Sequence, residues 1–296
     1  MTFDPVQFVT VGLNGLTQAA IYFLVASGFT LIFGLMRTVN LAHGSLYLFG
    51  AYLGWSVGAA LGKTAEAWVV AIVVAFVGMA LVGFLMQRLL LGWMAGQDLR
   101  QALVTIGLSI IAADLLLMRF GGVIYQFTPP PFLFGSTPIP FAVSGQYSTY
   151  RLFLVAAAIV IGLLLWLLLT RTKLGMIVRA GIDDRHMLSA LGVDVPRVFL
   201  LVFALGAGLA GLAGVLGGSA LSISPGEDAR YLLSSLVVVI VGGMGSLGGV
   251  AIGAVIVGVA EQYGNFYWPY YAPLVTFGIM AAVLALRPHG LRGRPA

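Results

Sequence analysis

Two short polar clusters interrupt an otherwise apolar sequence, and both contain residue types that could do chemistry. The first cluster holds Asn40, His43 and Ser45, with Gly44 among them. An imidazole at position 43 could relay a proton, although a single His beside an Asn is more often a hydrogen-bonded structural residue. Three His residues, no Cys and no group of carboxylates argue against a metal site.

The second cluster is the run from Gly243 to Gly248, which matches the dinucleotide fingerprint G-x-G-x-x-G. Glu261 lies about where the ribose-binding acid of that fingerprint is expected. However, residues 249–260 have no polar face and no alternating strand–helix pattern surrounds the run, so a nucleotide site is not indicated. Another candidate, at Lys63, has Val57 where a phosphate loop needs its first Gly. Any ATP hydrolysis that this chain depends on must therefore occur on another chain.

The composition decides what kind of element must hold these clusters. Only 15 Lys or Arg and 10 Asp or Glu occur among 296 residues, and 60% of the residues are apolar. A charged share of 8% is far below the roughly 25% of a soluble domain, which excludes a soluble enzyme and a disordered chain. The 40 Gly residues favour closely packed membrane helices. We predict an all-α, polytopic transmembrane helical bundle that forms one domain over residues 1–296.

About eight hydrophobic segments are candidates for crossing the membrane, since a spanning helix needs about 20 apolar residues. Seven of them cover residues 8–34, 41–61, 67–91, 101–118, 151–170, 198–223 and 270–286. The eighth, residues 231–262, is interrupted by glycines at positions 242, 243, 245, 248 and 249.

The distribution of basic residues predicts which loops face the cytoplasm. If residues 171–197 are cytoplasmic and the spans alternate from there, most basic residues fall inside. The inside residues are Arg37, Arg88, Arg100, Arg171, Lys173, Arg179, Arg185, Arg197, Arg287, Arg292 and Arg294, and the outside residues are Lys63, Arg119, Arg151 and Arg230. The C-terminus is then cytoplasmic.

The same alternation makes a prediction about the interrupted segment. Residues 231–262 must begin and end outside, so we expect two shorter helices that dip in and return, joined at the glycines. Alternation also puts residue 1 outside, although a half-span near residues 40–44 would reverse that.

Two loops differ strongly in composition. Residues 120–150 carry five prolines and no charge; we expect an extracytoplasmic loop that is a lid, a docking surface or a plain connector. Residues 171–197 carry eight charged residues, namely Arg171, Lys173, Arg179, Asp183, Asp184, Arg185, Asp194 and Arg197. Ala, Leu and Met dominate positions 187–191, which predicts a short interfacial helix that ends at Gly192.

The glycines and the buried polar residues predict two different roles. Gly50, Gly54, Gly58 and Gly62 recur every fourth residue, which is typical of a helix face that packs closely against another helix. Paired interruptions in two halves of a sequence instead indicate a midplane substrate path, which exposed helix ends can line. The candidate path residues are Asn40, His43, Gly44, Ser45, Gly242, Gly243, Gly245, Ser246, Gly248 and Gly249.

Three motifs carry a resemblance to a known family. They are residues 29–44 (FTLIFGLMRTVNLAHG) followed by the residues at 50–52 (GAY), residues 241–249 (VGGMGSLGG), and residues 287–291 (RPHGL). From about residue 10 to 291 the chain resembles the branched-chain amino acid permeases of ABC importers, and it is similar to the smaller, high-affinity Liv-type subunit. The resemblance implies a permease domain that translocates branched-chain or related amino acids across the bacterial or archaeal cytoplasmic (inner) membrane.

The resemblance also implies a set of partners. These are a second permease subunit in a heterodimer, two cytoplasmic ABC ATPase subunits, an extracytoplasmic solute-binding protein and the lipid bilayer. ATP and Mg would bind to the ATPase subunits, with no cofactor on this chain, no catalytic residue and no nucleic acid partner. The solute-binding protein would dock at residues 120–150 and 224–230.

The family also implies a coupling helix, the short cytoplasmic helix of an ABC permease that docks in a groove of the ATPase. The residues at that place are Arg179, Ala180, Asp183, Asp184, Arg185, Ala190, Leu191 and Gly192. Three alternatives remain open: a permease of the same family for urea or short amides, an intramembrane enzyme that uses His43 with Asp114 or Glu261, and an ion channel.

Overall fold

The computed structural model describes residues 4–36, 40–62, 64–139, 143 and 145–293. Arg37, Lys63 and Arg294, which the charge distribution assigned to loops, lie outside these residues, as do the side chains of Asp183 and Arg185. The α-helices are α1 (Pro5–Met36), α2 (His43–Leu61), α3 (Ala65–Met86), α4 (Asp98–Phe120), α5 (Thr149–Arg171), α6 (Lys173–Asp183), α7 (Arg185–Ala190), α8 (Val195–Ala220), α9 (Glu227–Gly242), α10 (Leu247–Tyr267) and α11 (Ala272–Leu286).

The predicted helical bundle is confirmed, and seven helical segments of the described chain are long and apolar enough to cross a membrane. They cover Pro5–Gly34, Ala65–Met94, Asp98–Phe120, Thr149–Arg171, Val195–Ala220, Leu247–Tyr267 and Pro269–Leu286. The expected span at residues 41–61 forms α2 but is not among the seven, because its Gly, Ser and His residues lower its hydropathy. It lies inside the bundle, against α3, α8 and α9.

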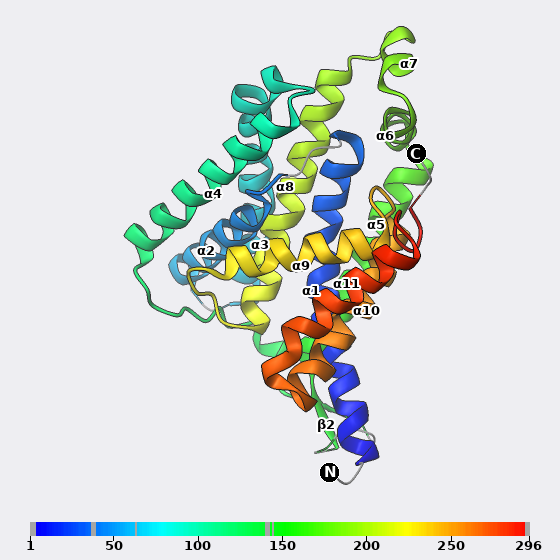
Figure 1. Ribbon diagram of the computed structural model, residues 1–296. Coiled ribbons are helices and arrows are strands. Elements are labelled where there is room, and N and C mark those ends of the chain that lie inside the picture. Colours follow the sequence, from blue (N-terminus) through cyan, green and yellow to red (C-terminus); the bar gives the residue numbers. More distant parts are fainter. Residues whose placement is uncertain (1–3, 37–39, 63, 140–142, 144, 294–296) are drawn as a thin grey trace.

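The core of the bundle is formed by α1 and α8, whose spanning windows are 83% and 72% buried. Around them, α3, α4, α5 and α11 present exposed Leu, Val and Ile side chains, which suit a lipid or protein environment. Figure 1 shows α8 and α1 running through the centre, with α9 lying across them.

The predicted glycine face on α2 is confirmed as a helix-packing surface at Gly50 and Gly54, whereas Gly58 meets the Phe127 ring of the 120–150 loop. A Cβ added at Gly50 would lie 2.3 Å from Gly211 Cα on α8, and one at Gly54 would lie 2.4 Å from Val215 Cγ2. No side chain other than hydrogen fits at such a separation, so these glycines bring the α2 backbone directly onto α8. Gly62 behaves differently: it follows the last residue of α2 with a φ of 90° and has nothing near it.

The predicted division of residues 231–262 into two helices at the glycines is also confirmed, but α10 is long enough to cross a membrane and is not the short helix that was expected. The first helix, α9, ends at Gly242, and the second, α10, begins at Leu247. Gly243 between them has a φ of 104°, a conformation that favours Gly. The two helices pack so closely that a Cβ on Gly253 would lie 2.5 Å from Val238 O.

The two distinctive loops lie at opposite ends of the bundle (Figure 1). Residues 120–150 include a 3-10 turn, η3 (Pro131–Leu133), and an antiparallel pair of strands, β1 (Ser136–Pro138) and β2 (Gln146–Ser148). The N-terminal end of α1 lies at this end, where Val143 N donates to Thr10 Oγ1 at 3.0 Å. The charged loop forms α6 and α7 at the other end.

Candidate functional site

The first interruption separates α1 from α2 and is built from buried polar side chains. Asn40 and His43 are 3% and 0% exposed. His43 Nε2 lies 3.0 Å from Val25 O, and its ring packs edge-on against Phe29. Asn40 Oδ1 accepts from Ala42 N at 3.1 Å. Within the described residues, Asn40 Nδ2 and His43 Nδ1 have no hydrogen-bond partner, which is costly unless a solute or water reaches them.

The start of α9 lies against this first interruption. A Cβ on Gly44 would lie 2.0 Å from Asp228 O, so only Gly allows this approach. Ser45 Oγ donates to Asp228 Oδ2 at 3.3 Å. Gly44 and Ser45 belong to the first interruption by their position in the sequence. Only the fold shows that the N-terminal turn of α9 packs onto them.

The second interruption is built from backbone. Gly242 and Gly249 meet face to face, since a Cβ on Gly249 would lie 2.1 Å from Gly242 O. Ser246 Oγ accepts from Gly249 N at 3.1 Å and caps α10. Gly245 N donates to Thr30 Oγ1 on α1 at 3.3 Å. Gly248 is exposed, and its added Cβ would meet Arg292 Nη1 at 3.2 Å.

The C-terminal segment closes the second interruption. Leu291 N donates to Val241 O at 2.9 Å and Arg292 N donates to Gly242 O at 3.0 Å. These two carbonyls are among those that the end of α9 leaves without an intrahelical partner. Residues 287–293, which we call the C-terminal strap, therefore satisfy backbone groups that would otherwise be unpaired inside the bundle.

The two interruptions both touch α1 but meet opposite ends of α9. Both lie beside α1, at Val25 and at Thr30. The first meets the start of α9 at Asp228, and the second is its end at Gly242. The assignment of both segments to one translocation path stays a prediction.

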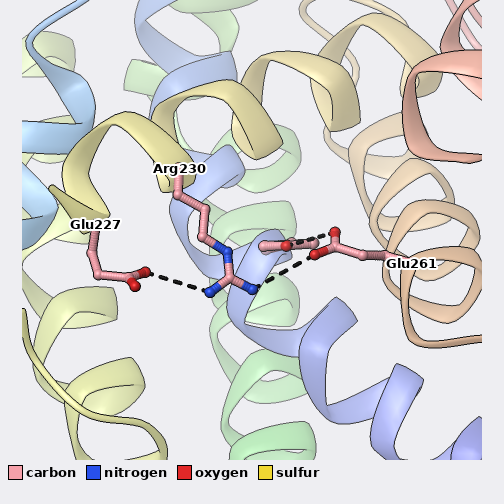
Figure 2. Close-up of polar contacts among 4 residues, drawn as sticks. Glu227, Arg230 and Glu261 are labelled. Carbon is pink, nitrogen blue, oxygen red and sulfur yellow. Dashed lines mark hydrogen bonds and ion pairs between the residues drawn. The ribbon is translucent and has the colours of Figure 1, made fainter. Parts of the chain in front are cut away.

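A cluster of ionised side chains joins α9 to α10, and no local sequence pattern assembles it (Figure 2). Arg230 Nη2 lies 3.6 Å from Glu261 Oε1, and Arg230 Nη1 lies 3.6 Å from Glu227 Oε2. Tyr22 donates from its hydroxyl to Glu261 Oε2 at 2.7 Å. The Arg230 side chain is 48% exposed and that of Glu261 is 15% exposed.

The charged residues of this cluster lie within helices. Glu261 belongs to α10, which continues to Tyr267, and its carboxylate reaches Tyr22, near the middle of α1. Arg230 was counted as an outer loop residue, but it belongs to α9, which begins at Glu227. The available signal was an ionisable residue at each end of the interrupted apolar segment 231–262, with Arg230 directly before it and Glu261 near its end.

A cavity of about 200 Å³ adjoins the cluster between α9, α10 and α11. Arg230 and Glu261 both line it, with Ser234, Asn265 and Thr276 as polar neighbours and Leu233, Val237, Ala272, Pro273 and Phe277 as apolar ones. It combines one cation, one anion, neutral hydrogen-bonding groups and an apolar wall.

The predicted coupling segment folds as two short helices. The Asp184 side chain between them accepts from Met187 N at 3.0 Å and caps α7. The predicted stop at Gly192 is confirmed by its φ of 80°. Arg179, Ala180 and Ala190 are exposed, and Leu191 is 74% exposed. Asp183 and Arg185 belong to α6 and α7 by their backbones.

One feature connects the coupling segment to the second interruption. A cavity of about 180 Å³ is lined by Val178 and Arg179 of α6, by Thr30 of α1 and by Gly245 and Gly248. Movement of α6 would therefore change the space beside the α9–α10 junction directly.

The proposed enzymatic groups are not brought together. His43 contacts Val25 and Phe29, whereas Glu261 contacts Tyr22 and Arg230. Asp114 is exposed on α4, and no ion pair joins it to Arg119 within the described part of the chain. Among those same residues, no group of three His, Cys, Asp or Glu side chains could hold a metal ion.

These features define a multi-pass membrane protein with polar groups and helix ends buried inside its bundle. A family model described as branched-chain amino acid transport system / permease component matches residues 12–284. The chain therefore belongs to this permease family, as its sequence motifs indicated.

Individual relatives agree with that assignment. The chain is 29% identical to the high-affinity branched-chain amino acid transport system permease protein BraD of Pseudomonas aeruginosa, over 95% of this chain and 94% of BraD. It is 28% identical to the corresponding protein LivH of Escherichia coli K12, over 100% of this chain and 98% of LivH. It is also 29% identical to LivM of the same organism, over 93% of this chain and 68% of LivM.

Proposed function

We propose that this membrane permease of an ABC importer carries branched-chain or closely related amino acids across a cytoplasmic (inner) membrane. The observation that carries the proposal is the family match over residues 12–284. It is supported by relatives that cover nearly the whole chain and are named as branched-chain amino acid permease proteins.

The proposal includes a heterodimer with a second permease subunit. LivH and LivM are both named as permease proteins of the high-affinity branched-chain amino acid transport system in one organism, and this chain resembles both. Two ATPase subunits that bind ATP and Mg would complete the importer on the cytoplasmic side. A solute-binding protein would dock at residues 120–150 and 224–230. The proposal is supported by two backbone hydrogen bonds of 2.9 and 2.7 Å between Tyr125 and Ile223, which bring the two segments together.

In this mechanism the ATPase subunits act on α6 and α7. Exposed Met187 on α7 and exposed Leu191 directly after this helix form an apolar surface in a charged loop, which suits docking to a groove. Closure of the ATPase pair would shift α6 against the cavity shared with Thr30 and Gly245. The α9–α10 junction would thereby alternate between two arrangements, opening the bundle first outward and then inward.

Replacement of Ala190 by Pro tests this coupling. Proline removes an N–H from the last turn of α7 and clashes with the carbonyl four residues earlier. We expect ATP hydrolysis to persist in reconstituted vesicles while amino acid uptake falls by about tenfold or more, which is about 1.4 kcal/mol of lost coupling. The matched control is Ala190→Ser, which keeps the helix. Normal uptake by the Pro variant would count heavily against the coupling role.

The substrate is tested by comparing solutes in the same vesicles. The complete complex should take up leucine, isoleucine or valine in an ATP-dependent manner and should discriminate against urea and short amides. Preferential uptake of urea or an amide would replace the amino acid assignment with that alternative. Turnover by the isolated chain would instead revive the enzyme hypothesis.

A further inference from the structure

The pairing of Arg230 with Glu261 is unusual for the interior of an apolar bundle. A charged side chain in hydrocarbon costs several kcal/mol, so an intramembrane ion pair generally marks a solute path or a functional site. With 48% of its side chain exposed, Arg230 must face water or a protein partner in the assembled membrane protein. The cavity of about 200 Å³ that both residues line provides that exposed space.

The geometry of the pair leaves hydrogen-bonding capacity for a ligand. Charge-assisted hydrogen bonds between guanidinium and carboxylate groups measure about 2.7–2.9 Å, whereas Arg230 lies 3.6 Å from both of its carboxylate neighbours. The Tyr22 hydroxyl holds Glu261 through Oε2 at 2.7 Å, so Oε1 is the atom that faces Arg230. The guanidinium and one carboxylate oxygen are thus aimed at each other without a direct hydrogen bond.

The local charges favour a ligand with no net charge. Among the described residues that line the cavity, the ionisable ones are Arg230 and Glu261, whereas Glu227 and Asp228 lie in the first turn of α9 outside that lining. This leaves Arg230 and Glu261 as one positive and one negative group at the cavity.

The remaining wall of the cavity is amphipathic. Leu233, Val237 and Phe277 supply an apolar surface, and Ser234, Asn265 and Thr276 supply neutral polar groups. A ligand that matches this wall carries two opposite charges close together and an apolar group next to them.

We propose that the cavity between α9, α10 and α11 is a binding site for the zwitterion of an apolar α-amino acid. Arg230 binds the α-carboxylate, Glu261 Oε1 accepts from the α-ammonium group, and the apolar wall contacts the side chain. This inference rests on the proposed transport of amino acids and names the residues that would recognise them. Urea and short amides lack both charges, so they would leave the pair unmatched.

The existing ion pair also explains how such a site could release its ligand. The zwitterion must compete with the attraction between Arg230 and Glu261, which lowers its net affinity. Weak binding suits a site through which a solute passes, because a tightly held solute would not leave.

The absence of Cys from the chain permits a direct test by labelling. Ser234→Cys introduces one thiol at the cavity, and its rate of modification by a small methanethiosulfonate reagent is measured in the complex with its partner permease and ATPase subunits, without solute-binding protein. L-Leucine at about ten times its dissociation constant should slow labelling by about tenfold, since the unoccupied fraction falls as 1/(1 + [L]/Kd). Leucinamide, which lacks the carboxylate, and isovalerate, which lacks the ammonium group, should protect far less, as should urea.

Two variants make the test specific. Arg230→Gln in the Ser234→Cys background should raise the leucine concentration needed for half-maximal protection by about ten- to a hundredfold. This is the expected effect of losing one charged hydrogen bond. Thr128→Cys, exposed in the 120–150 loop, should label at an unchanged rate with or without leucine and thereby reports an intact complex.

The outcomes separate this site from the proposed function. Uptake of leucine by the complete importer, with no protection of Ser234→Cys or with equal protection by leucinamide and isovalerate, overturns the site and leaves the transport function standing. A thiol at position 234 that is inaccessible to the reagent overturns it as well. Protection by leucine alone supports the site, even if the importer were found to prefer another zwitterionic amino acid.

Discussion

The two helix interruptions beside α1 look alike in sequence but are built in different ways. At residues 40–44, buried polar side chains hold the chain, and two of their nitrogen atoms, Asn40 Nδ2 and His43 Nδ1, have no partner within the described residues. At residues 242–249, glycine backbones pack against each other and the C-terminal strap binds the free carbonyls of Val241 and Gly242.

This difference predicts two different roles. The unpartnered polar atoms of the first interruption remain available to a passing solute or water. The satisfied backbone groups of the second interruption instead form a joint between α9 and α10. The second interruption also shares a cavity with α6, so a movement of α6 would change the space beside it directly. We therefore expect the second interruption to be more sensitive to added volume and the first to be more sensitive to lost polarity.

The largest effect is expected from Gly249→Leu. Its Cβ alone would lie 2.1 Å from Gly242 O, and α9 and α10 would have to separate. We expect a loss of about 3 kcal/mol in stability, measured as a lower thermal unfolding midpoint in detergent. The matched control is Gly278→Leu, because Gly278 on α11 has nothing within 4 Å. Equal midpoints for the two variants would show that the close packing of this junction is not required.

A smaller effect is expected from removal of the C-terminal strap. Truncation after Leu286 deletes the donors to Val241 O and Gly242 O, and two hydrogen bonds contribute about 2 kcal/mol together. The thermal midpoint should fall, and amide hydrogen exchange should accelerate across residues 243–250. Truncation after Gly293 is the control, since it retains both donors. If both truncated chains behave like the full chain, the strap does not stabilise the joint.

The smallest change in stability is expected from Asn40→Leu. The variant loses the Ala42 N to Asn40 Oδ1 hydrogen bond but also removes a buried amide donor, so the net change should stay within about 1 kcal/mol. Uptake should nevertheless fall by about fivefold if Nδ2 donates to the solute, because one hydrogen bond is worth about 1 kcal/mol. Ser27→Ala, which removes a buried hydroxyl bonded within α1, is the control for uptake. Unchanged uptake in Asn40→Leu would make the first interruption purely structural.

Sequence patterns predicted much of the architecture because they reflect local physics. The division of residues 231–262 followed from glycines and from the parity of the crossings, and the helix stop at Gly192 followed from its conformational freedom. The glycine face of α2 followed from helical spacing, which places Gly50 and Gly54 on one side regardless of the partner helix.

The Arg230–Glu261 pair could not be assembled in the same way. The two residues lie 31 positions apart on helices that run in different directions, and Tyr22 comes from a third helix. Their meeting depends on how α9 crosses α1 (Figure 1), and no local pattern encodes that crossing. The role of the strap was hidden for the same reason, because its donors serve carbonyls about 50 residues earlier in the chain.

The sequence by itself determined that this is a membrane protein, that it belongs to a permease family and that its helices are interrupted at two places. Composition, helical spacing and glycine content act within a single helix and therefore need no knowledge of neighbouring ones. Only the tertiary structure decided that the two breaks meet opposite ends of α9, and that Arg230 and Glu261 line one amphipathic cavity between α9, α10 and α11. That arrangement depends on which backbones can approach each other. A glycine in one helix permits a close approach, but its position in the sequence does not tell which other helix packs there.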